Sequence, residues 1–293
     1  MSSGNLIDLR RRVRSVKNIQ QITRAMKFVS ASRLRRAQER ILAARPYANR
    51  MLAVLNSLAT RVDPSAHPLL QVREGERVML VVITGDKGLC GAFNANVIKS
   101  AVQYIENEAT NRRLSLALVG RKGFEWFRHR PWPIRHQYLN IMSRVSFDYA
   151  KELADTLVEY YQNSELDSVY LVYNEFKSVI AQRVVLEPLL PIRRLELPEN
   201  VTPVEYIYEQ PPQELFDRLL PRHVQTQVFR AMLESEAAEN GARMTAMDSA
   251  TRNAAEMIDH LTLRINRLRQ ASITTEIIEI VSGANALQEG RSK

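Results

Sequence analysis

The segment that most suggests chemistry is the loop GDKGLCG at residues 85–91. It follows an apolar run and precedes a predicted helix, which is where nucleotide-binding folds hold phosphate groups on backbone N–H groups. Its glycines match neither the Walker A pattern nor GxGxxG, and a strand-to-helix turn needs glycines for its backbone alone. We therefore predict no cofactor here, and we expect Asn94 to cap the helix that follows.

Other reactive residue types are scattered along the chain. Cys90 is the single cysteine, which excludes a disulfide framework and a cysteine-based zinc site, and no base is identified beside it. The five histidines form neither HxxxH nor HExxH, so we predict no metal site, and no GxSxG motif is present. Trp126 and Trp132 lie among basic residues, which favours a tryptophan packed at a basic helix end. We expect no catalysis by this chain alone.

Positive charge is concentrated near the start of the chain. Residues 10–50 contain thirteen Lys and Arg and one acid, Glu39, so the net charge of this segment is +12. The whole chain has a net charge of +9, so the other residues together carry −3. A solvated helix face usually mixes signs. The imbalance predicts a partner that is nucleic acid, anionic lipid or an acidic protein surface.

Two long helices are predicted at the ends of the chain. Residues 5–45 lack proline and glycine, and their apolar residues, including Ile19, Ile22, Met26 and Val29, recur at steps of three and four. In the last third, a heptad pattern indicates a coiled-coil seam in a helix of ~110 Å, which needs a partner of similar length. The predicted seam is Met247, Thr251, Ala254, Ile258, Leu261, Ile265, Leu268 and Ser272, and it restarts at Ile273.

The middle of the chain alternates between strand and helix patterns. Apolar runs at 78–84, 114–120 and 168–176 predict buried strands, with a candidate strand at 204–208, and helix-like stretches lie between them. This alternation is typical of a parallel sheet covered on both faces. The fold class is therefore α/β plus a long antiparallel coiled coil. The predicted coil comprises residues 1–62 and 212–293, and the globular domain comprises 63–211.

Three motifs resemble the gamma subunit of F-type ATP synthases. They are IQQITRAMKFVSAS at 19–32, the loop at 85–91, and RQASITTEIIEIVSGANA at 269–286. The resemblance implies two terminal helices in an antiparallel coiled coil and a central Rossmann-like domain that binds no nucleotide. It implies one gamma subunit inside three alpha and three beta subunits, with epsilon and a ring of c subunits as further partners. The implied function is a rotor shaft that couples proton flow to ATP synthesis at the beta subunits.

The resemblance also implies roles for single residues. Arg24, Met26 and Lys27 would face lever loops of the beta subunits. The catch loops would meet Arg269, Gln270, Thr274 and Glu276, and an apical bearing would hold Ile277, Ile280, Ala284 and Leu287.

The resemblance further implies where the protein acts. The stretch 183–201 lacks the insertion and cysteine pair of chloroplast relatives, which favours a bacterial enzyme. We expect a peripheral protein on the cytoplasmic face of the bacterial cell membrane, with membrane contact through the ring only and residue 1 as the mature start.

Two other functions fit parts of the sequence. A nucleic-acid-binding coiled-coil protein would use the basic segment to track phosphates, and its binding would weaken steeply with salt. An enzyme would use the α/β domain and the 85–91 loop, and its ligand would stabilise that domain. We rank both below the rotor, and we predict no nucleic-acid partner.

Overall fold

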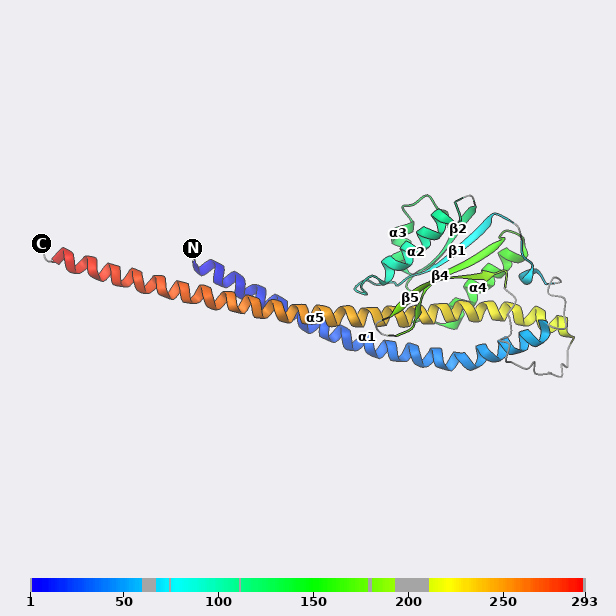
Figure 1. The fold of residues 1–293 in the computed structure, drawn as a ribbon, viewed down its shortest axis with the longest axis horizontal. Helices are drawn as coiled ribbons and strands as arrows, with labels where there is room; N and C mark the ends of the chain where they lie inside the picture. The colour runs from blue at the N-terminus through cyan, green and yellow to red at the C-terminus, as the bar shows by residue number, and fades with distance from the viewer. Residues whose placement is uncertain are drawn as a thin grey trace. The chain divides into compact units, whose positions relative to one another are not determined.

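The computed structural model describes residues 2–59, 67–73, 75–110, 112–178, 181–192 and 211–291. Its contacts divide the chain into two units, and Figure 1 shows the helices and strands of the fold. Unit 1 holds the residues up to Val29 and those from Ala246 onward, and unit 2 holds Ser30–Thr245. In chain order, the elements are α1 (Ser2–Ala59), η2 (Pro68–Leu70), β1 (Arg77–Ile83), α2 (Phe93–Asn107), β2 (Arg113–Val119), α3 (Arg121–Phe127), β3 (Ile134–Tyr138), α4 (Phe147–Gln162), β4 (Ser168–Phe176), β5 (Gln182–Leu190) and α5 (Pro212–Arg291).

Unit 2 contains a five-stranded sheet in the order β3-β2-β1-β4-β5. The three strands predicted from apolar runs are confirmed as β1, β2 and β4, and they pair in parallel. β3 extends the parallel part, whereas β5 is antiparallel to β4. Only residues 177–181 connect β4 to β5. A parallel crossover needs roughly a dozen residues, so this short connection forces a hairpin.

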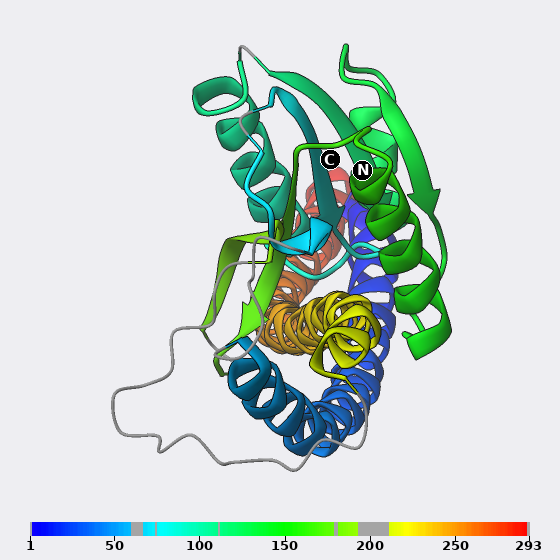
Figure 2. The same cartoon turned by 90° about the vertical axis from the view of Figure 1, so that its right-hand side faces the viewer.

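Two hydrophobic cores lie on the two faces of the sheet. Along β1, Met79, Val81 and Ile83 face a core that includes α4 and the first part of α5. Val78, Leu80 and Val82 alternate with them and pack against α2 and α3. Figure 2 shows the teal α2 and the green α4 on opposite sides of the sheet. Burial of both faces explains why β1 is apolar throughout rather than alternating.

Two local predictions for the globular part, a helix cap at Asn94 and a strand at 204–208, are not confirmed. Asn94 is not the helix cap: α2 begins at Phe93 after Ala92, which makes no side-chain capping bond. The candidate strand at 204–208 lies outside the described residues. Within the described ranges, no helix is both long and apolar enough to cross a membrane.

Unit 1 is built from the start of α1 and the last part of α5. Between Glu256 and Ser272 on α5, the five predicted seam positions are partly buried and every other residue is exposed. The predicted heptad seam of α5 is therefore confirmed over this stretch.

On α1, the apolar pattern predicts the helix correctly but not its buried face. Leu9 is buried, as the pattern suggests, but Ile19, Ile22 and Val29 are 50%, 59% and 52% exposed. Thr23, a polar residue, is only 8% exposed. Hydrophobic period alone therefore misplaces the seam in the middle of this segment.

Candidate functional site

The loop at 85–91 is hydrogen-bonded to neighbouring segments of the chain, and its Asp86 side chain occupies backbone N–H groups that lie near it. Asp86 accepts hydrogen bonds from the backbone N–H groups of Arg121 at 3.0 Å, Asn140 at 2.8 Å and Met142 at 2.9 Å. The N–H of Arg121 lies at the start of α3, where an anion would bind in a nucleotide-binding fold. A carboxylate of the chain itself holds these donors.

Side chains of α5 fill the space beneath the same loop. Arg243 donates to the carbonyl oxygen of Gly88 at 3.2 Å through Nη2, and it also pairs with Glu239. A Cβ atom added to Gly85 would lie 2.8 Å from the carboxylate carbon of Glu239, so a side chain there would require that carboxylate to shift. Burial raises the pKa of Glu239, and the Arg243 guanidinium acts in the opposite direction.

Asn94 and Cys90 complete this internal network. Asn94 Oδ1 accepts a hydrogen bond from the N–H of Gly85 at 2.8 Å, and its Nδ2 lies 3.2 Å from Cys90 Sγ. Cys90 is 1% exposed, and burial raises the pKa of its thiol. A buried thiol with a raised pKa is a poor nucleophile. The loop therefore functions as a structural tie.

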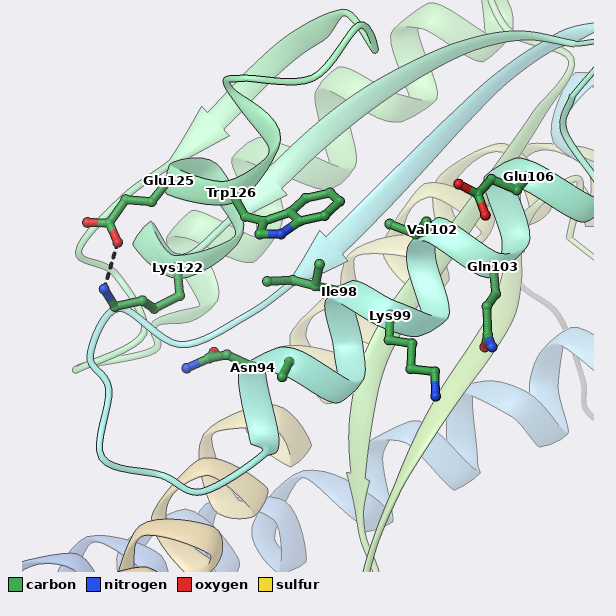
Figure 3. Close-up of a pocket in the computed structure, with 10 residues that line it drawn as sticks. Asn94, Ile98, Lys99, Val102, Gln103, Glu106, Lys122, Glu125 and Trp126 are labelled. Carbon is green, nitrogen blue, oxygen red and sulfur yellow. Dashed lines mark hydrogen bonds and ion pairs between the residues drawn. The ribbon is translucent and has the colours of Figure 1, made fainter.

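A groove of about 720 Å³ lies between α2 and α3 (Figure 3). Ile98, Val102 and Trp126 line it, and Lys122 pairs with Glu125 across 2.6 Å at its edge. In the described parts of the chain, no three His, Cys, Asp or Glu residues are grouped so that they could hold a metal ion. The other polar residues that line the groove are Asn94, Lys99, Gln103 and Glu106.

The two helices of unit 1 run antiparallel. Lys27 Nζ lies 2.5 Å from Asp248 Oδ1, and the hydroxyl oxygens of Thr23 and Thr251 lie 2.8 Å apart. Because the helices are antiparallel and Lys27 lies beside Asp248, Ser2 lies at the same height along the pair as Ile273. Each of these residues is 25 positions from its member of the Lys27–Asp248 pair. Beyond Ile273, no described residue of α1 lies alongside α5.

The predicted lever-loop contacts lie on α1 beside this pairing. Arg24 is exposed, Met26 is half-buried, and Lys27 is held by Asp248. Lys27 therefore already has a partner within the chain.

The predicted catch-loop contacts lie at a different level. Arg269, Gln270, Thr274 and Glu276 are all exposed on α5, and the Thr274 hydroxyl donates to the carbonyl oxygen of Gln270 at 2.9 Å. Arg269 is eighteen residues beyond Thr251, which is about 27 Å along a helix. The structure therefore does not bring the two predicted contact groups together.

The predicted bearing residues lie on the exposed end of α5. Ile277 is 56% exposed and Ile280 is 72% exposed, with Ile278 and Val281 exposed beside them. The side chains of Ala284 and Leu287 lie outside the described residues. An apolar surface that no other described residue covers is typical of a site that contacts another protein.

Most of the basic segment of α1 faces solvent. Arg35 pairs with Glu39 at 3.1 Å, and Arg40 pairs with Glu236. Among residues 10–40, the exposed cations for which the described residues offer no ion-pair partner are Arg10, Arg11, Arg12, Arg14, Lys17, Arg24, Arg33 and Arg36. We refer to these eight residues as the basic stripe.

Sequence reasoning missed the polar residues of α5 that face the rest of the chain. Glu236, Glu239 and Arg243 are 6%, 5% and 8% exposed, and Asp248 pairs with Lys27. Charged residues on a helix are ordinarily exposed, so their residue types give no indication that these side chains are buried. Glu239 pairs with Arg243 on the same helix. The other partners, of Glu236, Arg243 and Asp248, are about 150 to 220 residues away in sequence, beyond the reach of any local pattern.

Comparisons with known proteins cover almost the whole chain. The family model described as ATP synthase matches residues 5–287. The ATP synthase gamma chain of Solibacter usitatus is 53% identical over 97% of this chain and 99% of its own length. That of Geobacter metallireducens is 51% identical over the same shares.

Solved structures give the same result for the fold. A chain in the structure of the central stalk and c-ring of the Tetrahymena thermophila mitochondrial ATP synthase has a TM-score of 0.59 and 27% identity, over 78% of this chain and 99% of that one. A chain of the Euglena gracilis mitochondrial enzyme has a TM-score of 0.69 over 99% of this chain and 97% of that one, at 20% identity, and supports the fold alone. With its matched motifs, its helix pair and its central sheet, this chain belongs to the ATP synthase gamma-chain family.

Proposed function

We propose that this chain is the central rotor shaft of an F-type ATP synthase. As a non-catalytic subunit, it couples proton flow through the membrane ring to ATP synthesis at the beta-subunit sites by rotating. The observation that carries this proposal is the apolar end of α5, which continues past the level of Ser2 with Ile277 and Ile280 exposed. Such a surface needs a protein partner.

The proposed partners are three alpha and three beta subunits around one copy of this chain, epsilon, and the ring of c subunits. Membrane contact is through the ring only. The curated relatives are gamma chains of bacteria, which supports a location on the cytoplasmic face of the bacterial cell membrane. As domains, we propose a shaft of residues 1–62 and 212–293 and a globular domain of 63–211.

We propose that two groups of residues, at different heights along the helix pair, contact loops of the beta subunits. Arg24, Met26 and Lys27 would meet the lever loops. Arg269, Gln270, Thr274 and Glu276 would meet the catch loops. Their separation of about 27 Å along α5 supports two separate contacts. The proposed apical bearing is Ile277, Ile280, Ala284 and Leu287.

Asymmetry of the helix pair is the proposed source of coupling. α1 and α5 present different residues in different directions, so three equivalent beta subunits meet three different surfaces. A contact shifts a nucleotide site only by the difference between its free energies in the open and closed forms. Rotation would then change the affinity of each beta subunit in turn.

The direct test is co-purification of the full chain with alpha and beta subunits, followed by a count of this chain per hexamer. The rotor requires one copy. Zero copies, or three, would contradict the proposal.

A second test concerns the basic stripe as an electrostatic bearing. Replacing Arg10, Arg11, Arg12, Arg14 and Arg33 with glutamine should weaken assembly and make it less sensitive to salt, because exposed ion pairs contribute only about 0.2–1 kcal/mol each but add up. A single replacement should change little. The control removes five cations outside the stripe: Lys99, Arg112, Arg113, Arg128 and Lys151. An unchanged salt dependence in the stripe variant would refute the electrostatic bearing.

A further inference from the structure

A cavity of about 260 Å³ lies between β5 and the first part of α5, within unit 2. The residues of its apolar wall are Leu171, Pro188, Leu189 and Ile192. The three aliphatic members of this wall belong to the hydrophobic core on that face of the sheet. A dry apolar cavity of about 150 Å³ is enough to hold a benzene ring, so this cavity has room for a small organic molecule.

Three polar side chains complete the lining of the cavity. Glu187 comes from β5, and His223 and Gln227 come from α5. Because His223 and Gln227 are four positions apart on one helix, they project from the same side of it. An apolar cavity with a few convergent polar groups is the usual form of a small-molecule site.

The carboxylate of Glu187 already has its partners within the chain. Arg230 Nη2 donates to both of its oxygens, at 2.9 Å to Oε1 and 2.8 Å to Oε2, and the hydroxyl of Tyr173 donates to Oε2 at 2.8 Å. A complete ion pair offers neither a cation nor an anion an unbalanced charge, and burial of a charged ligand without a partner is costly. The cavity therefore favours a neutral ligand.

Gln227 has an acceptor that the described parts of the chain leave unused. Its Oε1 is buried, and no described group donates a hydrogen bond to it. Arg230 Nε and Glu234 Oε2, on the same side of α5, are also buried without a partner. Buried polar groups in native proteins are ordinarily hydrogen-bonded, so an orphan oxygen at a cavity wall indicates a donor that comes from a bound molecule.

The ring of His223 can complete the hydrogen bonds of the same bound group. His223 is 7% exposed, and no described residue hydrogen-bonds to its ring. Burial is the main cause that lowers its pKa, to about 4, with Arg230 adding to it and Glu187 opposing it, so the ring is neutral at pH 7. A neutral imidazole carries one N–H donor and one nitrogen acceptor. A hydroxyl group both donates and accepts, which matches Gln227 and His223 together.

We propose that this cavity is a binding site for small neutral molecules that have an apolar body and one hydroxyl group, for which phenol is the simplest aromatic probe. The hydroxyl donates to Gln227 Oε1 and accepts from the N–H of His223, and the ring contacts the apolar wall. The inference goes beyond the rotor function. A molecule bound here would also stabilise the packing of α5 against β5.

The first test compares phenol with toluene, which carries a methyl group in place of the hydroxyl. The full-length chain is labelled with ¹³C in its histidines, and His223→Gln assigns the ring signals. We expect phenol to shift the His223 signals with a Kd of about 1 mM, while those of His129, which is exposed, stay in place. An absence of saturable shifts up to about 20 mM phenol would overturn the proposal.

The ratio of the two affinities tests recognition of the hydroxyl. A purely apolar cavity would bind toluene more tightly, because phenol must give up hydrogen bonds to water. If Gln227 and His223 replace those bonds, phenol binds at least as tightly as toluene. A preference for toluene of several-fold would contradict the proposed hydrogen bonds.

Gln227→Leu tests the acceptor itself, because it removes Oε1 while keeping a side chain of similar volume. The affinity for phenol should fall about tenfold, and that for toluene should not fall. The matched control is Gln103→Leu, the same change at an exposed residue of the groove between α2 and α3 (Figure 3), and it should leave both affinities unchanged. An unchanged phenol affinity in Q227L, or an equal loss in Q103L, would refute the site.

Gln227→Met covers the case in which Q227L loses its helices by circular dichroism. Its flexible side chain fills the same space without a strong acceptor, so phenol binding should again weaken about tenfold. Retention of full phenol affinity in Q227M would overturn the role of Gln227. These results would leave the rotor function untouched, because that function is tested by the number of copies of this chain per hexamer.

Discussion

The guanidinium of Arg243 on α5 holds the carbonyl oxygen of Gly88 from two nitrogens, Nη2 at 3.2 Å and Nε at 3.4 Å. This joins the longest helix of the chain to the loop that follows β1. The loop has the position of a phosphate-binding turn, yet an arginine holds its carbonyl oxygen and Asp86 occupies the N–H donors around it. The loop therefore connects α5 to the carboxyl ends of the strands.

Gly85→Ala should destabilise unit 2 by about 1–3 kcal/mol, because its Cβ would meet a buried carboxylate that Arg243 holds in place. Gly88→Ala is the matched change, since nothing lies within 4 Å of its Cβ position, and it should stay within about 0.5 kcal/mol. Urea unfolding of both variants measures the difference. Equal stabilities would show that Glu239 can move aside freely.

Asp86→Asn should also destabilise the fold, by about 1–3 kcal/mol, because an amide can present only one oxygen to three backbone N–H groups. Glu159→Gln, a charge-neutralising change at an exposed position of α4, is the control. Thermal unfolding at neutral pH gives the comparison. If the two variants have the same unfolding temperature, the Asp86 hydrogen bonds contribute nothing measurable to stability.

His223 should make stability sensitive to mild acid. Burial is the main cause that lowers its pKa, to about 4, and Arg230 adds to it while Glu187 opposes it. The unfolded chain takes up a proton near pH 6.5 and the folded chain does not, so stability is full above pH 6.5 and falls as pH decreases toward 4. Between pH 7 and pH 5 the loss should be about 2 kcal/mol.

His223→Gln removes this titration and should flatten the pH profile of urea unfolding over that range. His129→Gln, at an exposed site, should keep the profile of the parent. A His223→Gln profile as steep as the parent's would mean that another group is responsible.

Ala237→Leu should separate α1 from α5 within unit 2. Ala37 and Ala237 are fully buried in one cluster with Leu34, so the helices meet there through methyl groups. A larger side chain should cost about 1–3 kcal/mol through overpacking. Ala43→Leu, at an exposed position of α1, should change stability by less than about 0.5 kcal/mol. Denaturant titration distinguishes the two, and a neutral A237L would show a looser contact than the structure has.

Local sequence patterns determined a large part of this protein. The near-absence of glycine and proline predicted both long helices, and the heptad spacing predicted which residues of α5 are partly buried between Glu256 and Ser272. Continuous apolar runs located β1, β2 and β4, because strands buried on both faces must be apolar throughout. β3, β5 and α3 carry no such run and were missed.

Tertiary structure decided the rest. The sequence does not show that Thr23 and Lys27 face α5 while Ile19 and Ile22 face outward, because the partners Thr251 and Asp248 are more than 200 residues away. Nor does it show that the glycine-rich loop is held by Arg243, since a glycine turn looks the same whether a phosphate or a buried side chain lies beside it. Periodicity reports how a segment prefers to fold, whereas the partner of each polar group is fixed only when distant segments meet.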